Sequence, residues 1–220
     1  MEIKRLNYPV LNNPREALLL PLADLYSATV MSRMAQEGKR PQNTVKAQGD
    51  TFTYSLRDGE PSFPLPGIVV KREGESALWL GAPKLDESSP CGRKIVGHYE
   101  GLLGPILDAQ RIDLDVDADP LNGTTLKGSL GSVKLRETLS NSSLNADKVA
   151  DFSIEGRVGG LDYQEEFYLS KDEIHMNSRG RLGREKVERK AELLPDGSVK
   201  VKGRIGEMEF EEFIVGQPRK

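Results

Sequence analysis

One segment of the chain carries four carboxylates that alternate with apolar residues: Asp113, Asp115, Asp117 and Asp119. Alternation in a strand places all four on one face. Hard cations such as Ca²⁺ bind several carboxylate oxygens, but the segment lacks the glycine and the closing glutamate of a helix–loop–helix calcium site. We therefore expect an exposed acidic strand face, neutralised by Lys127 and Lys134 on the next hairpin.

The two histidines, His98 and His175, and the lone Cys91 are the other candidates for metal, acid–base or nucleophilic chemistry. Such chemistry needs them to converge with carboxylates or with each other. Strand alternation places both histidines opposite the apolar residues, on the surface. Arg93 favours a thiolate at Cys91, but no histidine partner is placed beside it. We expect no metal site and no cofactor, and we assign no catalytic residue.

The elements that position side chains in this chain are repeated hairpins. The pattern of glycine, any residue, apolar residue and glycine occurs five times, beginning at Gly101, Gly128, Gly156, Gly180 and Gly203. A self-similarity of this kind indicates a repeated supersecondary unit. Apolar residues shift parity after the second glycine of each repeat, which is typical of a two-residue hairpin loop.

The repeats predict five such loops, at 104–105, 131–132, 159–160, 183–184 and 206–207. Glycine in the first position favours type II′ turns. The residues expected to face each other across the turns are Leu103 and Ile106, Leu130 and Val133, Val158 and Leu161, and Ile205 and Met208. One rung further out, the first glycine of four repeats faces a bulky residue: Leu135, Tyr163, Val187 or Phe210. The opposite face carries charge pairs and is expected to face water.

One inward position breaks the apolar pattern and holds charged residues, which we call the inward cluster: Glu137, Glu165, Arg189 and Glu212. Stacked hairpins would place Arg189 between Glu165 and Glu212. The cluster could orient a ligand, form a structural ion pair, or turn into water at a bulge. The candidate ligand-binding residues are the inward cluster with two aromatic neighbours, Tyr163 and Phe210.

The N-terminal segment has the helical periodicity. Asn13 and Pro14 suit a helix start, and Pro21 then interrupts or restarts the helix. Apolar residues recur from there at helical spacing, and we expect the other side to carry Asp24, Ser32, Arg33 and Gln36. Gly38 is a suitable stop, followed by a linker over 38–43. The expected domains are a helical arm and linker over 1–46 and an antiparallel β domain over 47–220.

The fold class that follows is mainly β: an antiparallel meander of hairpins forming a closed or half-closed barrel, with one N-terminal amphipathic helix. About a dozen strands are too many for one flat sheet. A two-sheet sandwich is the alternative. Tight turns at one end and longer loops at the other are usual for meander barrels, whose open mouth carries binding loops.

Composition excludes several function classes. A net charge of −3 gives no electrostatic case for nucleic acid or an anionic membrane. No apolar run approaches the roughly 20 residues that span a bilayer, and residues 1–15 do not read as a signal peptide. A single cysteine fits a reducing compartment, so we expect a cytoplasmic protein.

The sequence leaves three functional hypotheses. The first is a non-enzymatic β-barrel-like protein that binds an apolar small molecule or a protein partner. The second is a hydrolase or isomerase built around the inward cluster. The third is a structural component that assembles through sheet edges. An enclosed pocket would favour the first, a charged cluster in a cleft the second, and a filled interior with unpaired edges the third.

Overall fold

The protein is described by a computed structural model that covers residues 13–19, 24–56, 68–72, 75–86, 94–103, 110–119, 123–141 and 150–218. Two helices come first, α1 (Pro14–Ala17) and α2 (Leu25–Gln36). The strands are β1 (Lys39–Ala47), β2 (Asp50–Leu56), β3 (Ile68–Arg72), β4 (Glu75–Asp86), β5 (Lys94–Leu103), β6 (Gln110–Asp119), β7 (Gly123–Leu130), β8 (Val133–Asn141), β9 (Phe152–Val158), β10 (Leu161–Leu169), β11 (His175–Leu182), β12 (Glu185–Leu193), β13 (Val199–Ile205) and β14 (Met208–Pro218).

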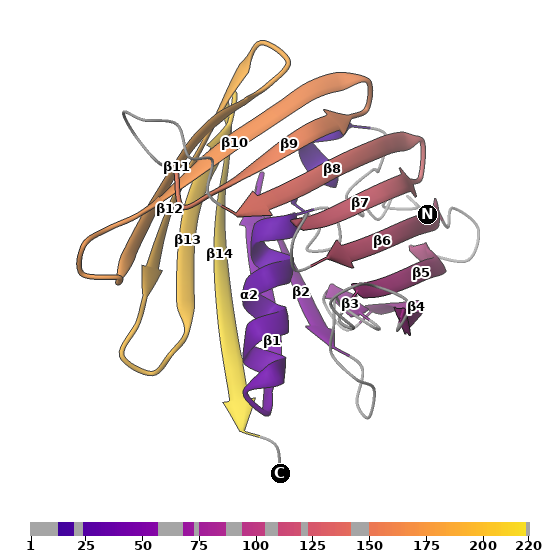
Figure 1. Cartoon of the computed structure of the whole chain (residues 1–220), viewed down its shortest axis with the longest axis horizontal. Helices are drawn as coiled ribbons and strands as arrows, with labels where there is room; N and C mark the ends of the chain where they lie inside the picture. Colours follow the sequence, from indigo (N-terminus) through magenta and orange to yellow (C-terminus); the bar gives the residue numbers. More distant parts are fainter. Residues whose placement is uncertain are drawn as a thin grey trace, which may run out of the picture.

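The strands form an antiparallel meander, as predicted. Consecutive strands pair from β1 to β14, and β1 pairs with β14 as well as with β2. In Figure 1 the sheet curves around α2, with β10 to β14 on one side of the helix and β6 to β8 on the other. We call the side of the sheet that faces α2 the inner face and the opposite side the outer face.

Four of the five glycine hairpins have the predicted register. The pairs Leu130↔Val133, Val158↔Leu161 and Ile205↔Met208 flank their turns, and Leu182↔Glu185 flanks the fourth. At 131, 183 and 206 the glycine has φ near +60° and the next residue does not have positive φ, which fits a type II′ turn.

Two predicted turns are wrong. Gly159 and Gly160 both have positive φ, +58° and +81°, so this turn has the type I′ pattern, which a second glycine permits. Leu103 pairs with Gln110, not with Ile106, so the connection between β5 and β6 is longer than a two-residue loop. Proline at position 105 cannot donate a backbone hydrogen bond, which disfavours the tight turn there.

The first glycine of three repeats, at 128, 156 and 180, allows neighbouring backbones to come close. Gly156 faces Tyr163 on β10 as predicted, and on its other side it faces Glu137 of β8. A Cβ at Gly156 would lie 2.0 Å from the carbonyl oxygen of Arg136. Equivalent backbone contacts of 2.0 Å occur at Gly128 and Gly180, whereas a Cβ at Gly203 would meet the ring of Phe210. These glycines therefore permit tight strand packing where the sheet curves.

Helix α2 lies against the inner face, and the predicted sidedness of this segment is wrong in part. Asp24 and Ser32, expected on the polar side, are each 2% exposed. The sheet curves around the helix, so more than one helical side is covered. Asp24 is also the N-cap, with extended φ and ψ of −88° and 90°, so its side chain does not follow the helical faces.

The segment 38–43, expected to be a linker, is largely strand: β1 begins at Lys39 and pairs with two strands. Its burial alternates along its length, so the period is that of a strand. Strand β4 runs on to Asp86. Cys91 and Pro21 lie outside the described residues, and the division at residue 46 stays a prediction.

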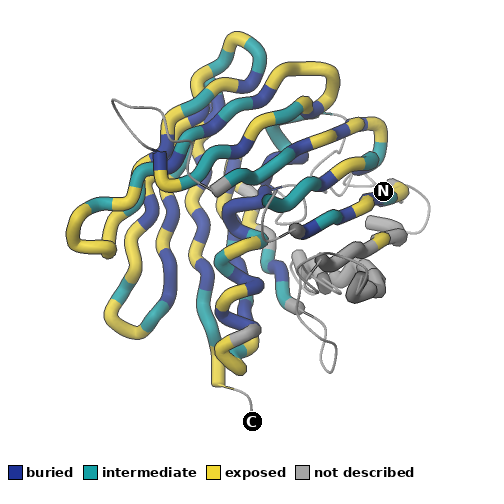
Figure 2. The backbone as a smooth tube through the Cα atoms, viewed as in Figure 1, coloured by how far each residue is buried: buried dark blue, intermediate teal, exposed yellow. Residues whose placement is uncertain are grey.

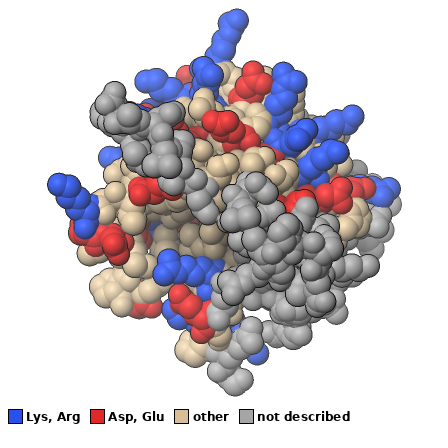
Figure 3. Space-filling model, viewed as in Figure 1, with Lys and Arg blue, Asp and Glu red and all other residues tan. Residues whose placement is uncertain are grey.

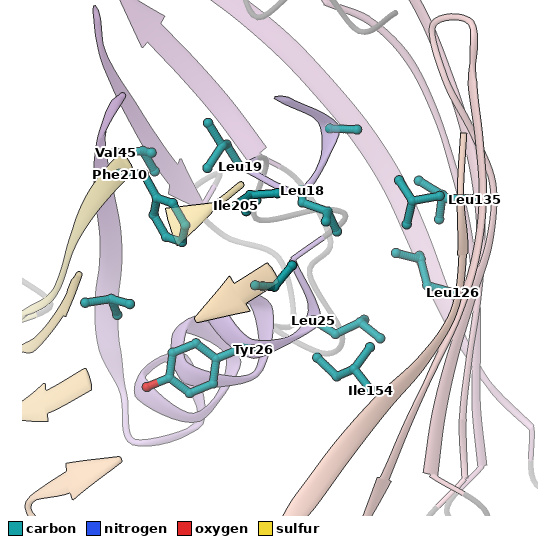
Figure 4. Packing of buried hydrophobic residues seen from close by; sticks show 14 of the residues in the cluster. Leu18, Leu19, Leu25, Tyr26, Val45, Leu126, Leu135, Ile154, Ile205 and Phe210 are labelled. Atoms are coloured by element: carbon teal, nitrogen blue, oxygen red, sulfur yellow. The ribbon is translucent and has the colours of Figure 1, made fainter. Parts of the chain in front are cut away.

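The core lies between α2 and the inner face. Figure 2 shows buried residues alternating with exposed ones along β10 to β14. Figure 4 shows Leu25 of α2 directed toward Ile154 of β9, with Leu126 and Leu135 on the facing wall. Tyr26 stacks on Phe167 with ring centroids 5.4 Å apart, and Phe167 stacks on Phe152 at 4.4 Å. Burial of this apolar surface supplies the main favourable free energy of the fold.

Substituting Gly156→Ala should destabilise the protein. The new methyl group must push the backbones of β8 and β9 apart, and overpacking of this kind costs about 1 to 3 kcal/mol. Urea unfolding measures the change. Gly160→Asn is the matched control, because a Cβ at Gly160 meets no atom within 4 Å and asparagine tolerates positive φ. Equal stabilities of the two variants would contradict the close-packing role of Gly156.

Candidate functional site

The structure places all four members of the inward cluster in the protein interior. Glu137 lies on β8, Glu165 on β10, Arg189 on β12 and Glu212 on β14, with exposed fractions of 0%, 0%, 2% and 2%. The remaining predicted residues, Tyr163 and Phe210, are buried beside them. None of the four charges turns into water at a bulge. Four buried charged side chains are unusual, because ionised groups in an apolar interior need a partner.

Arg189 makes two ion pairs. Its Nη1 donates to Oδ2 of Asp24 at 2.5 Å, and its Nε lies 3.0 Å from Oε1 of Glu165 without hydrogen-bond alignment. Its guanidinium carbon also lies 5.6 Å from the ring centroid of Phe210. Asp24 is the N-cap of α2, where it accepts a hydrogen bond from the Tyr26 backbone N–H at 3.2 Å. The pair therefore joins the helix to the middle of the sheet.

Glu165 is held from three sides. The Tyr163 hydroxyl donates to Oε2 at 2.5 Å, and the Ser178 hydroxyl donates to Oε1. Ser178 also faces Arg189 across β11 and β12. Burial, followed by the charge of Glu165, raises the pKa of Tyr163, so the phenol remains a donor. This part of the cluster is a satisfied hydrogen-bonded network.

Glu212 contacts the helix instead of Arg189. Its Oε2 accepts hydrogen bonds from Ser27 at 2.5 Å and from the side-chain amide of Asn43 at 2.9 Å. Ser27 also donates to Asp24 at 2.9 Å in an alternative to that bond. The prediction that Arg189 lies between Glu165 and Glu212 is thus right for Glu165 only. The second partner of Arg189 is Asp24, the N-cap of α2.

Several buried polar atoms of the inner face have no hydrogen-bond partner among the described residues. Both carboxylate oxygens of Glu137 are in this state, as are the Tyr54 hydroxyl, Oδ1 of Asn43, Nη2 of Arg189 and Oε1 of Glu212. Proteins pair most of their buried polar groups, so a concentration of unpaired ones in one region needs an explanation.

Burial acts strongly on the acids that Arg189 does not neutralise. It raises the pKa of Glu137 well above its usual range, and the charge of Asp24 raises it further. Burial, then the charge of Asp24, raises the pKa of Glu212 to about 7, although Arg189, Ser27 and Asn43 oppose this. Burial lowers the pKa of Arg189, but Asp24 and Glu165 outweigh it, so the guanidinium stays charged.

The other candidates from the sequence do not join the cluster. The apolar residues between the aspartates are buried, and Asp115 points to the outer face, where it faces Lys127 and lies 2.8 Å from Nδ1 of exposed His98. Lys134 faces Ser129 and does not neutralise this row. His175 is exposed beside Asp172. Within the described ranges, no three histidine, cysteine or acidic side chains form a group that could hold a metal ion.

The outer face carries the charge pairs. Arg157 contacts Asp162 at 3.0 Å and Lys202 contacts Glu211 at 3.3 Å. A groove of about 890 Å³ runs over β11 to β14 and the turn between β1 and β2, and half of the residues that line it are charged. Its lining also includes Ser178, Arg189 and Phe210, so the groove borders the candidate site on the inner face. Figure 3 shows uncharged side chains in a hollow near the centre of the visible surface, with charged side chains close to its edge.

No protein-family model, curated protein or solved structure matches this chain. Neither helix in the described part of the chain is long and apolar enough to cross a membrane. Function must therefore be inferred from the chemistry of the site itself.

The sequence did not reveal Asp24, Ser27 or Asn43 as members of the site. Asp24 and Ser27 lie on a helix whose docking position is not encoded in a local pattern, and Asn43 lies in the segment interpreted as a linker. One signal was present: Asp24, Ser27 and Ser32 lie among the apolar residues of this helical segment.

Substituting Arg189→Met should lower the free energy of unfolding by about 3 to 5 kcal/mol, because Asp24 and Glu165 would be left as unpaired buried charges. Lys190→Met is the matched control, since Lys190 is the exposed neighbour on the same strand, and surface substitutions change stability by only about 0.5 kcal/mol. Chemical denaturation of both variants measures the difference. A loss at Arg189 no larger than at Lys190 would show that the ion pairs contribute little.

Stability should fall as the pH rises from about 4.5 to about 7, because folded Glu212 retains its proton up to a pKa of about 7 whereas its ordinary value is 4.5. In this window the unfolded chain loses the proton first. Glu212→Gln keeps an oxygen that accepts from Asn43 but cannot titrate. In this variant the fall in the free energy of unfolding across the window should be smaller by on the order of 1 to 3 kcal/mol.

Urea unfolding at a series of pH values tests this, with Glu211→Gln on the outer face as control. Because the pKa of Glu137 is also raised, some slope should persist in the Glu212 variant. Parallel profiles for wild type and Glu212→Gln would refute the assignment.

Proposed function

We propose that the protein is a non-enzymatic binding protein whose inner face binds an apolar small molecule. The inner face carries apolar residues from many strands, which are buried in one core cluster with α2: Val45, Leu114, Leu126, Ile154, Val201, Phe210 and Ile214. Sites for small molecules combine such a surface with a few polar groups that fix the orientation of the ligand. The inward cluster supplies those polar groups at the centre of the apolar surface.

We further infer that the sheet closes into a barrel around this surface. The supporting observation is that β1 pairs with both β14 and β2, and that pairing continues through β3, β4 and β5. Closure gives a meander an inside that water does not enter freely. An enclosed inner face is better suited to carrying an apolar molecule than to exchanging charged substrates.

The observation that carries the proposal is the set of unpaired polar atoms on the inner face. A region built only to stabilise the fold would satisfy Glu137, Tyr54 and Asn43, because each unsatisfied buried group costs about 1 to 3 kcal/mol. Departures from this rule concentrate at functional sites. Groups of both donor and acceptor type remain available there, which suits a ligand that is mostly apolar and carries a polar group.

The two alternative functions have less support. A hydrolase or isomerase would need charges free to act on a substrate, yet Arg189 and Glu165 are engaged with each other and with Asp24. Assembly through sheet edges would need unpaired strands, whereas the strand order gives each strand two neighbours. We place the protein in the cytoplasm, because a single cysteine fits a reducing compartment.

The test is a titration of the full chain with N-phenyl-1-naphthylamine, a neutral apolar dye that fluoresces on leaving water, with native mass spectrometry of the purified protein. We expect saturable binding of one dye per chain, weakened about three- to tenfold by Phe210→Leu on the inner face, where part of the apolar contact is lost. Phe213→Ser is the control, because this aromatic residue is 42% exposed. Absence of binding, or equal weakening by both variants, would overturn the proposal.

A further inference from the structure

The carboxylate that reaches Arg189 from α2 uses only part of the guanidinium. Asp24 accepts from Nη1 alone, while Nη2 is buried and has no hydrogen-bond partner in the described part of the chain. A free carboxylate can bind Nη1 and Nη2 together in a bidentate arrangement, which is stronger and more specific than a single contact. The sheet therefore presents a carboxylate-binding group that its own helix satisfies only partly.

Behind Asp24, α2 presents an apolar surface to the inner face. The side chains of Leu25, Tyr26, Met31 and Met34 are all between 0% and 6% exposed. Tyr26 stacks on Phe167 at 5.4 Å, and the helix contacts β1 and β14 along its length. Thus α2 places one carboxylate, followed by apolar side chains, against the inner face. That combination is also the chemistry of a long-chain carboxylic acid.

The strand pairing does not involve α2, because each described strand pairs only with other strands. The outer side of the helix, at Thr29 and Arg33, is exposed, and Figure 1 shows it in front of β1 and β14. It joins β1 through Gly38, which has φ of +78° and where an added Cβ would meet no atom within 4 Å. Its buried side also contains Ser27 and Ser32, which contribute less hydrophobic stabilisation than apolar residues would.

We propose that a long-chain carboxylic acid binds to the inner face in exchange for α2, with its carboxylate replacing that of Asp24 on Arg189. This inference rests on the proposed function and narrows it to one class of ligand. The exchange keeps Arg189 paired with a carboxylate, so it avoids the large cost of an uncompensated buried charge. The apolar tail replaces Leu25, Tyr26 and their neighbours on the same surface.

The experiment compares dodecanoic acid with dodecanol and methyl dodecanoate, each below its aggregation limit, as competitors of N-phenyl-1-naphthylamine on the full chain. We expect the acid to bind at least tenfold more tightly than the alcohol or the ester. Asp24→Asn should tighten acid binding about tenfold, because asparagine preserves the helix cap but no longer competes as an anion for Arg189. Asp162→Asn on the outer face is the control and should change nothing.

Hydrogen exchange provides the second measurement. Backbone amides of 25–36 should lose protection when the acid is bound, while those of β12 to β14 should keep theirs. Equal affinity for acid, alcohol and ester, no effect of Asp24→Asn, or retained protection of α2 would each overturn the exchange of α2 for a carboxylate ligand, while the proposed function would stand because the neutral competitors bind. If the dye and all three competitors fail to bind, the proposed function itself fails.

Discussion

The guanidinium of Arg189 is the group on which the arrangement of helix and sheet depends. It is the only buried cation among the described residues, and it is surrounded by four buried acids: Asp24, Glu137, Glu165 and Glu212. One positive charge cannot compensate four negative ones. Arg189 pairs directly with two of the acids, and the pKa values of the other two are raised, which favours their neutral forms. Docking of α2 is therefore tied to the protonation of the interior.

The repeated glycines make this interior possible. Gly156, Gly180 and Gly203 lie on the inward side of adjacent hairpins, next to members of the cluster: Glu137 faces Gly156, Glu165 faces Gly180 and Arg189 faces Gly203. A Cβ at Gly156 or Gly180 would meet the backbone of the neighbouring strand, and a Cβ at Gly203 would meet the ring of Phe210. The glycine pattern that marks the repeats in the sequence therefore also allows close packing of strands and of the Phe210 ring next to the cluster.

The sequence was sufficient to predict those parts of the fold in which the interacting residues are close together in the chain. Turn glycines and the parity of apolar residues predicted the register of four hairpins, because both constraints act within about ten residues of each other. The same register correctly placed Glu165 and Arg189 on the inward side. The partners from α2 were not predictable, because Asp24 lies 165 residues before Arg189 and Ser27 lies 185 residues before Glu212, on a helix whose docking is decided by the whole curved sheet. Asn43 was missed because the stretch 38–43, after the helix stop at Gly38, was interpreted as a linker, although the segment pairs with two strands.

The site differs from an ordinary core because polar groups attach the helix to the sheet. An all-apolar helix on an all-apolar sheet would be held by non-directional hydrophobic contacts and close packing, without directional polar contacts. In this protein one end of α2 is attached through directional contacts of Asp24 and Ser27, while both oxygens of Glu137 have no hydrogen-bond partner among the described residues. A buried ion pair is weak evidence for stability, because well-packed apolar residues often serve as well. Its retention at the centre of this apolar face agrees with the proposed recognition of a carboxylate, which apolar residues cannot provide.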